Sequence, residues 1–199
     1  MIILQEIIHF VLIYGCLIIS FLYRKRTKSN LYIYFVIICT LETLPHLFSI
    51  ELNRFYSFSS LLYIAFFTYY FSRQVSSYRN TVYAVGLFSF FCCLIFIFNA
   101  KETYPIPLAI TFCAFYIILS FLYFFNQLKS RSRVYVFHKE AFWVSSALLL
   151  WSVFFLFRII PMSWLEKNDM GFLLLINNVF KGATLVSYLL CLIAVTRKH

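Results

Sequence analysis

Long apolar runs recur along this chain and are separated by short polar stretches. Seven runs cover residues 2–23, 31–50, 55–72, 81–99, 106–127, 141–160 and 171–195. A helix needs about 20 apolar residues to cross the roughly 30 Å hydrocarbon core of a bilayer, and most of the runs have that length. The runs are continuous, whereas the strands of a membrane barrel alternate apolar and polar residues. The pattern predicts an all-α, polytopic membrane protein with seven transmembrane helices in a single domain, residues 1–199.

The third run is the least apolar of the seven. Ser57, Ser59, Ser60, Thr68 and Arg73 lie near its two ends. A re-entrant third segment, with six crossings in all, therefore stays open as an alternative.

The distribution of Lys and Arg predicts how the helices are oriented. Twelve basic residues follow the first, third, fifth and seventh runs, and four lie in or beside the other loops. Because short cytoplasmic loops carry the excess of positive charge, we expect the N-terminus outside the cell and the C-terminus in the cytoplasm. An even number of crossings would spoil this alternation. The cytoplasmic patch expected to bind lipid headgroups or a partner contains Arg24, Lys25, Arg26, Lys28, Lys129, Arg131, Arg133 and Lys139.

The amino-acid composition indicates that most of the chain is surrounded by lipid rather than water. Hydrophobic residues make up 63% of the 199 residues and charged residues 12%, whereas a soluble domain is about half apolar and a quarter charged. The net charge of +10 resides in the loops, so we expect a bilayer as the partner and no direct binding of nucleic acid. The first run has its basic residues behind it rather than before it, so we expect it to stay as a helix rather than be cleaved as a signal peptide.

Ionisable and amide side chains occur inside two of the runs. Placing such a group in a membrane costs free energy, so each needs a structural or functional explanation. Glu42 and His46 lie four residues apart on one face of the second helix, and Asn177, Asn178 and Lys181 lie in the seventh. At about 1.5 Å per residue, Glu42 and Lys181 are both roughly 15–16 Å deep. Equal depth predicts a Glu42–Lys181 pair and a contact of His46 with an asparagine, if the two helices are neighbours.

This predicted cluster has three interpretations. It is a polar clasp that fixes helix packing, a site for a ligand, proton or ion, or a set of residues that do not meet. Glu6, His9 and Arg158 lie near the expected outer surface, where long or amphipathic side chains reach the headgroups.

No catalytic or metal motif accompanies the cluster. The chain has no phosphate-binding loop and no hydrolase signature, and its six cysteines fall inside apolar runs, where thiols pack as small hydrophobes. Arg133 and His138 have the spacing of the HEPN ribonuclease motif, but that nuclease needs a soluble helical bundle, and a short loop carries the pair here. We expect no enzyme activity, no cofactor and no metal.

Two segments resemble a known module. They are residues 105–108 with 117–129, and residues 142–157 with Asn177–Gly182. Together they are similar to the seven-helix membrane module that precedes histidine kinases in Bacteroidota, in which Lys181 matches a lysine of the final helix. No kinase domain follows here, so output would come from a separate partner. In size and composition the chain also resembles membrane accessory proteins encoded beside type VI-B CRISPR nucleases.

Three functions follow as hypotheses. The first is a non-enzymatic sensory, regulatory or accessory module of the bacterial inner membrane that acts through a cytoplasmic protein. The second is an oligomeric pore or channel in antiviral CRISPR defence, for which Ser57, Ser60, Thr68 and Tyr69 form the only candidate lining. The third, a transporter or membrane enzyme, has only Glu42, His46 and Lys181 in its favour, and the chain has no inverted repeat of broken helices.

Overall fold

The computed structural model describes residues 2–27, 29–48, 52–99, 105–129 and 136–197, and over these residues each of the seven apolar runs is helical. Side chains are described over the same ranges except at residues 2–7, 25–27, 45–48 and 52–55. Over the described residues the chain forms α-helices and two short 3₁₀ turns, with no strand. The predicted all-α fold class is confirmed.

The helices follow the predicted runs closely. The 3₁₀ turns are η1 (Ser76–Tyr78) and η2 (Val136–His138), which precede the fourth and sixth long helices. A short helix between the sixth and seventh runs was not predicted. In chain order the helices are α1 (Ile2–Thr27), α2 (Leu31–Phe48), α3 (Leu52–Gln74), α4 (Arg79–Asn99), α5 (Ile106–Lys129), α6 (Glu140–Ile159), α7 (Met162–Asn168) and α8 (Met170–Thr196).

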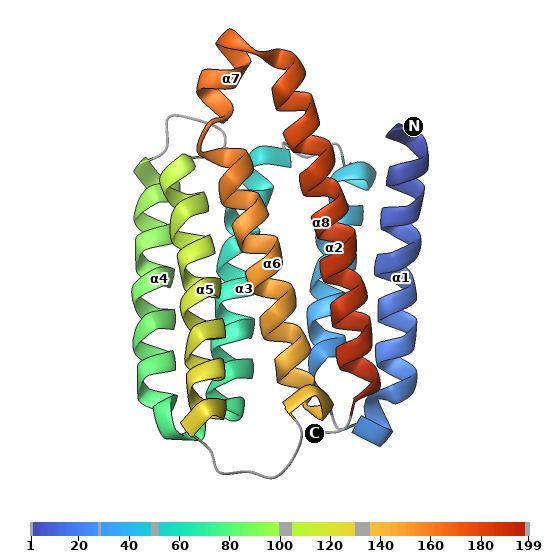
Figure 1. The fold of residues 1–199 in the computed structure, drawn as a ribbon, viewed down its shortest axis with the longest axis vertical. Helices are drawn as coiled ribbons and strands as arrows, with labels where there is room; N and C mark the ends of the chain where they lie inside the picture. Colours follow the sequence, from blue (N-terminus) through green and yellow to red (C-terminus); the bar gives the residue numbers. More distant parts are fainter. Residues whose placement is uncertain (1, 28, 49–51, 100–104, 130–135, 198–199) are drawn as a thin grey trace.

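Successive long helices run in alternating directions, so the two chain ends lie at opposite ends of the bundle (Figure 1). Each long helix packs against the next, and α8 closes the bundle by packing against both α6 and α1. We call the end with the N-terminus and α7 the α7 end. The opposite end, at which α1, α3, α5 and α8 end, is called the basic end.

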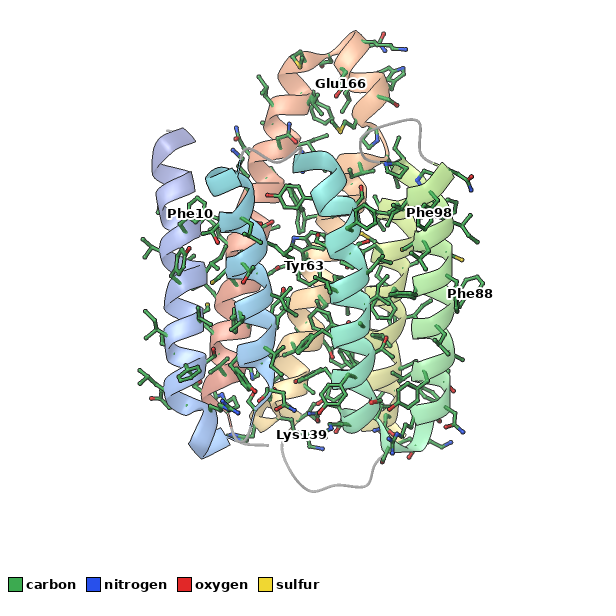
Figure 2. All side chains as sticks on the ribbon, turned by 180° about the vertical axis from the view of Figure 1, so that it is seen from behind. Phe10, Tyr63, Phe88, Phe98, Lys139 and Glu166 are labelled. Carbon is green, nitrogen blue, oxygen red and sulfur yellow. The ribbon has the colours of Figure 1, made fainter. Side chains whose placement is uncertain are left out.

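Aromatic rings fill the middle of the bundle around α3. Phe67 is 1% exposed, and its ring centroid lies 5.0 Å from that of Tyr34 on α2 and 5.1 Å from that of Tyr116 on α5. Trp151 of α6 lies 6.1 Å from Tyr116 and continues the cluster. Such pairs add about 0.5–1.5 kcal/mol each beyond the burial of their surface. Figure 2 shows Tyr63 at the centre of this packed interior.

Four helices in the described part of the chain are long and apolar enough to cross a membrane. They are α4 together with η1, α5, α6 and α8, and α1 and α2 contribute shorter apolar stretches. The outward face of α4 exposes 70% of Phe88 and 77% of Phe98, which project from the side of the bundle in Figure 2. Apolar faces of this extent are stable against lipid. The bundle is therefore compatible with a multi-pass membrane protein.

α3 does not meet the same criterion, in keeping with its weak apolar pattern. It is nevertheless a continuous helix of 23 residues that extends from the α7 end to the basic end (Figure 1). Two of its serine hydroxyls form hydrogen bonds within the helix. Ser59 donates to the Tyr56 carbonyl and Ser60 to the Ser57 carbonyl, both at 2.7 Å. A re-entrant segment would turn back part-way, so this geometry differs from the six-crossing alternative.

α7 and the first turns of α8 form a hairpin that projects beyond the other helices (Figure 1). Asp169 lies between the two helices and caps α8, because its side chain accepts a hydrogen bond from the Phe172 amide at 2.9 Å. Leu165 of α7 packs against Leu173 and Ile176 of α8. The hairpin thus has a small apolar core of its own.

Candidate functional site

Glu42 lies on α2 in the half of the bundle nearer the α7 end, and it is half-buried. The hydroxyl of Tyr56 on α3 donates a hydrogen bond to its Oε2 at 3.3 Å. A second tyrosine of α3, Tyr63, interacts electrostatically with the same carboxylate. Glu42 therefore faces the interior of the bundle and is held by α3.

Lys181 is exposed on α8. Its link to Glu42 is His9 of α1, which interacts with both residues. The His9 side chain is half-buried and interacts electrostatically with both Glu42 and Lys181. Its ring centroid lies 5.5 Å from that of Tyr188 on α8. The structure thus brings together groups from α1, α2, α3 and α8, with His9 inside the cluster rather than only at the surface.

Asn177 has a partner other than the predicted one. Its Oδ1 accepts a hydrogen bond from the Arg158 Nε at 2.7 Å, and the guanidinium lies 5.1 Å from the Phe180 ring centroid. α6 and α8 pack along their length, which places the last turn of α6 beside the start of α8. Arg158 is therefore paired rather than merely extended to the surface. Asn178 is exposed, and the side chain of His46 lies outside the described residues.

A second buried carboxyl group, which the sequence did not single out, lies at the basic end. Glu140 begins α6 and is 1% exposed. Its Oε1 accepts a hydrogen bond from the Tyr70 hydroxyl at 2.9 Å, and it also interacts with the Ser29 hydroxyl that precedes α2. Glu140 lies on the same helical face as Val144 and Ala147, and that spacing is the sequence signal for its burial.

The basic patch is described only in part, because Lys28, Arg131 and Arg133 and the side chains of Lys25 and Arg26 lie outside the described residues. At the basic end, Lys139 donates to Gln127 at 2.7 Å. Four other described cations at this end lie over tyrosine rings. The cation-to-centroid distances are 4.2 Å for Arg24–Tyr32, 4.6 Å for Arg73–Tyr69, 5.6 Å for Arg79–Tyr83 and 5.9 Å for Lys129–Tyr78.

These pairs place amphipathic rings and cations in one layer, as at the interface of a membrane with water. Figure 2 shows Lys139 in this layer and Glu166 at the opposite end of the molecule.

Metal chemistry has no support among the described residues. No group of three His, Cys, Asp or Glu side chains there is arranged to hold a metal ion. The cysteines are free, and all but Cys92 are buried.

Comparison of the chain with protein-family models, curated proteins and solved structures finds no match. The site must therefore be interpreted from its own chemistry.

Proposed function

We propose that this chain is a seven-span protein of the bacterial inner membrane that acts as a non-enzymatic regulatory or sensory module on a cytoplasmic partner. The observation that carries the proposal is the gathering of cations at one end of an alternating bundle. The partner binds this basic end, with the C-terminus on the cytoplasmic side and the N-terminus outside.

Seven crossings are supported by the packing of α1, α2 and α3. These helices lie alongside the four that are long and apolar enough to span a bilayer. α3 packs between α2, α4 and α5, which hides its less apolar surface from lipid. Helices with polar residues are tolerated in a membrane when their polar groups face protein.

The orientation is supported by the loops. Because the helices alternate, α1, α3, α5 and α8 end on one side of the bundle. In the sequence, twelve basic residues follow the first, third, fifth and seventh runs, against four in or beside the other loops. Placing the richer end in the cytoplasm satisfies the positive-inside rule. The anionic inner leaflet and an acidic protein surface both bind such an end.

A pore is supported less well. Ser57 and Ser60 are 4% and 2% exposed, so they are not available to line a channel between protomers. Tyr69 faces outward on the same helix and lies against Arg73. The candidate lining is therefore divided between the inside and the outside of the bundle. The aromatic core occupies the space that a pore within one protomer would need.

The likeness to the module of Bacteroidota histidine kinases supports a signalling partner. The likeness in size and composition to type VI-B CRISPR accessory proteins supports a partner in antiviral defence instead. Both proposals share a soluble protein that binds the basic end, so one experiment addresses the common claim.

Cross-linking capture from bacterial membranes with the full-length chain tests the docking. We expect a defined cytoplasmic protein to be recovered by the wild type and lost when Arg24, Lys129 and Lys139 are changed to Gln together. Lys167→Gln is the matched control, because Lys167 is exposed at the α7 end. A partner retained equally by the triple variant would contradict docking at the basic end.

A further inference from the structure

α3 carries tyrosines at seven-residue intervals, Tyr56, Tyr63 and Tyr70. Seven residues make nearly two helical turns, so the three share one face and are spaced about 10.5 Å along the axis. That face is the interior one: Tyr70 is 3% exposed, and Tyr63 packs against the core formed with α1 and α2. The adjacent Tyr69 points outward and is 42% exposed.

Each end of this tyrosine series is hydrogen-bonded to a carboxyl group. Tyr56 donates to Glu42 at 3.3 Å in the half nearer the α7 end. Tyr70 donates to Glu140 at 2.9 Å at the basic end. A carboxyl group inside an apolar bundle is costly unless it is hydrogen-bonded or paired, and inside a membrane such groups mark ion pathways and proton relays. A single helix thus connects acids that lie near opposite ends of the molecule.

The space between the two ends holds further hydroxyl and thiol groups. The ring of Tyr34 on α2 lies 6.0 Å from that of Tyr63. Tyr188 of α8 packs against the same small core of α1 and α2 as Tyr34 and Tyr63. Cys191, one turn further along α8, is 4% exposed and lies in the larger core with Tyr70, against which Tyr34 also packs. These interior groups lie between the Glu42–Tyr56 pair and the Tyr70–Glu140 pair.

We propose that this series is a proton path between the two ends of the bundle, and that the protein conducts protons slowly across the membrane. The proposal rests on the membrane crossing argued under the proposed function. A phenol hydroxyl both donates and accepts a hydrogen bond. It can therefore take a proton on its oxygen and pass its own proton onward. The same property distinguishes the series from the Phe, Leu, Ile and Val side chains that pack around it in the core.

The transfer is balanced without another reactant. A proton from the α7 side binds Glu42, each hydroxyl or thiol accepts one proton and releases one, and Glu140 releases a proton at the basic end. Among the described residues, His9 interacts electrostatically with both Glu42 and Lys181. The Tyr70 and Ser29 hydroxyls hydrogen-bond to Glu140. Phe66 and Phe67 pack between Tyr34 and Tyr70, so this part of the path limits the rate.

The test measures proton flux into vesicles that contain the purified full-length chain. Internal pyranine reports pH while a potassium gradient with valinomycin sets the membrane potential. We expect flux above that of protein-free vesicles, and a loss of about tenfold or more, which corresponds to a higher barrier to transfer, in Glu42→Gln and in Tyr70→Phe. Tyr69→Phe is the matched control, since it removes a hydroxyl from the next residue on the outward face, and we expect it to conduct as the wild type does.

Three results would overturn the path. They are wild-type flux equal to that of empty vesicles, equal flux in Tyr70→Phe and Tyr69→Phe, and release of a trapped dye with the protons, which indicates an open pore. Thermal unfolding in detergent verifies that each variant is folded, and Tyr63→Phe provides a second interior variant if Tyr70→Phe does not fold. Flotation of the chain with the vesicles separates the two proposals. If the chain floats with the vesicles but does not conduct, only the proton path is contradicted. If the chain does not float, the proposal that it is a membrane protein is contradicted.

Discussion

At the scale of single residues, Glu140 connects several elements of the basic end. It lies at the start of α6 and meets Tyr70 of α3 and Ser29 at the start of α2. From the sequence it is a loop residue beside Lys139, because the predicted sixth run begins only at residue 141. Its place on the face of Val144 and Ala147 is visible only once the helix is known to begin at residue 140.

Changing Glu140 tests this connection. We expect Glu140→Ala to lower the free energy of unfolding by about 2–4 kcal/mol, because it leaves a cavity and a buried Tyr70 hydroxyl without its acceptor. Glu140→Gln keeps an acceptor oxygen and should cost less. Thermal unfolding in detergent measures both, and Glu166→Ala on the exposed surface of α7 is the control. Equal melting of Glu140→Ala and the control would contradict a structural role.

The sequence identified the polar residues of α2 and α8, such as Glu42, Asn177 and Lys181, but it did not predict all of their partners. Helix rise alone predicted that Glu42 and Lys181 have similar depths, and both interact electrostatically with His9. The pairing of Asn177 with Arg158 was not predicted, because it depends on the rotation of α8 against α6. A hydrophobic pattern that is apolar all round the helix does not fix that rotation.

At the scale of helices, the α3–α4 contact depends on a glycine. A Cβ at Gly86 would come within 2.6 Å of the Thr68 Cγ2, and even closer to its Oγ1. The side chain of Thr68 cannot easily move away from an added Cβ, because a β-branched side chain has few allowed rotamers. The missing side chain thus allows close approach of α4 to α3, as small residues do between membrane helices.

Gly86→Ala is expected to destabilise the bundle by about 1–3 kcal/mol through this overlap. Gly182→Ala on α8 is the matched control, because no atom lies within 4 Å of its added Cβ. The control should be neutral or slightly stabilising, since alanine favours a helix over glycine by up to about 1 kcal/mol. Melting temperatures of the two variants in the same detergent decide the point. A Gly86→Ala variant as stable as Gly182→Ala would show that α3 and α4 are not in close contact.

The seven long helices were predictable because each is a long apolar run. α7 was not, since its seven residues are too few for a periodic pattern and include Glu166 and Lys167. Its only local signals are Pro161 before it and Asp169 after it, and both residues also suit a plain turn.

At the scale of the whole molecule, alternation explains most of the architecture. Successive long helices reverse direction, and in the sequence the stretches after odd-numbered runs carry many more basic residues than the others. The sequence therefore predicts the element order and the grouping of charge. It does not predict which helices adjoin α8, because closure of the bundle by α1 and α6 arises from packing between distant parts of the chain.

Labelling of single introduced cysteines tests the central claim, that a seven-span protein holds its basic end in the cytoplasm. Lys167→Cys lies at the α7 end and His138→Cys at the basic end, and both positions are exposed. With a membrane-impermeant maleimide on intact spheroplasts, and the wild type as the blank, we expect Lys167→Cys to react at once. His138→Cys should react only after permeabilisation. Reaction of both positions from the same side of the membrane would contradict the account.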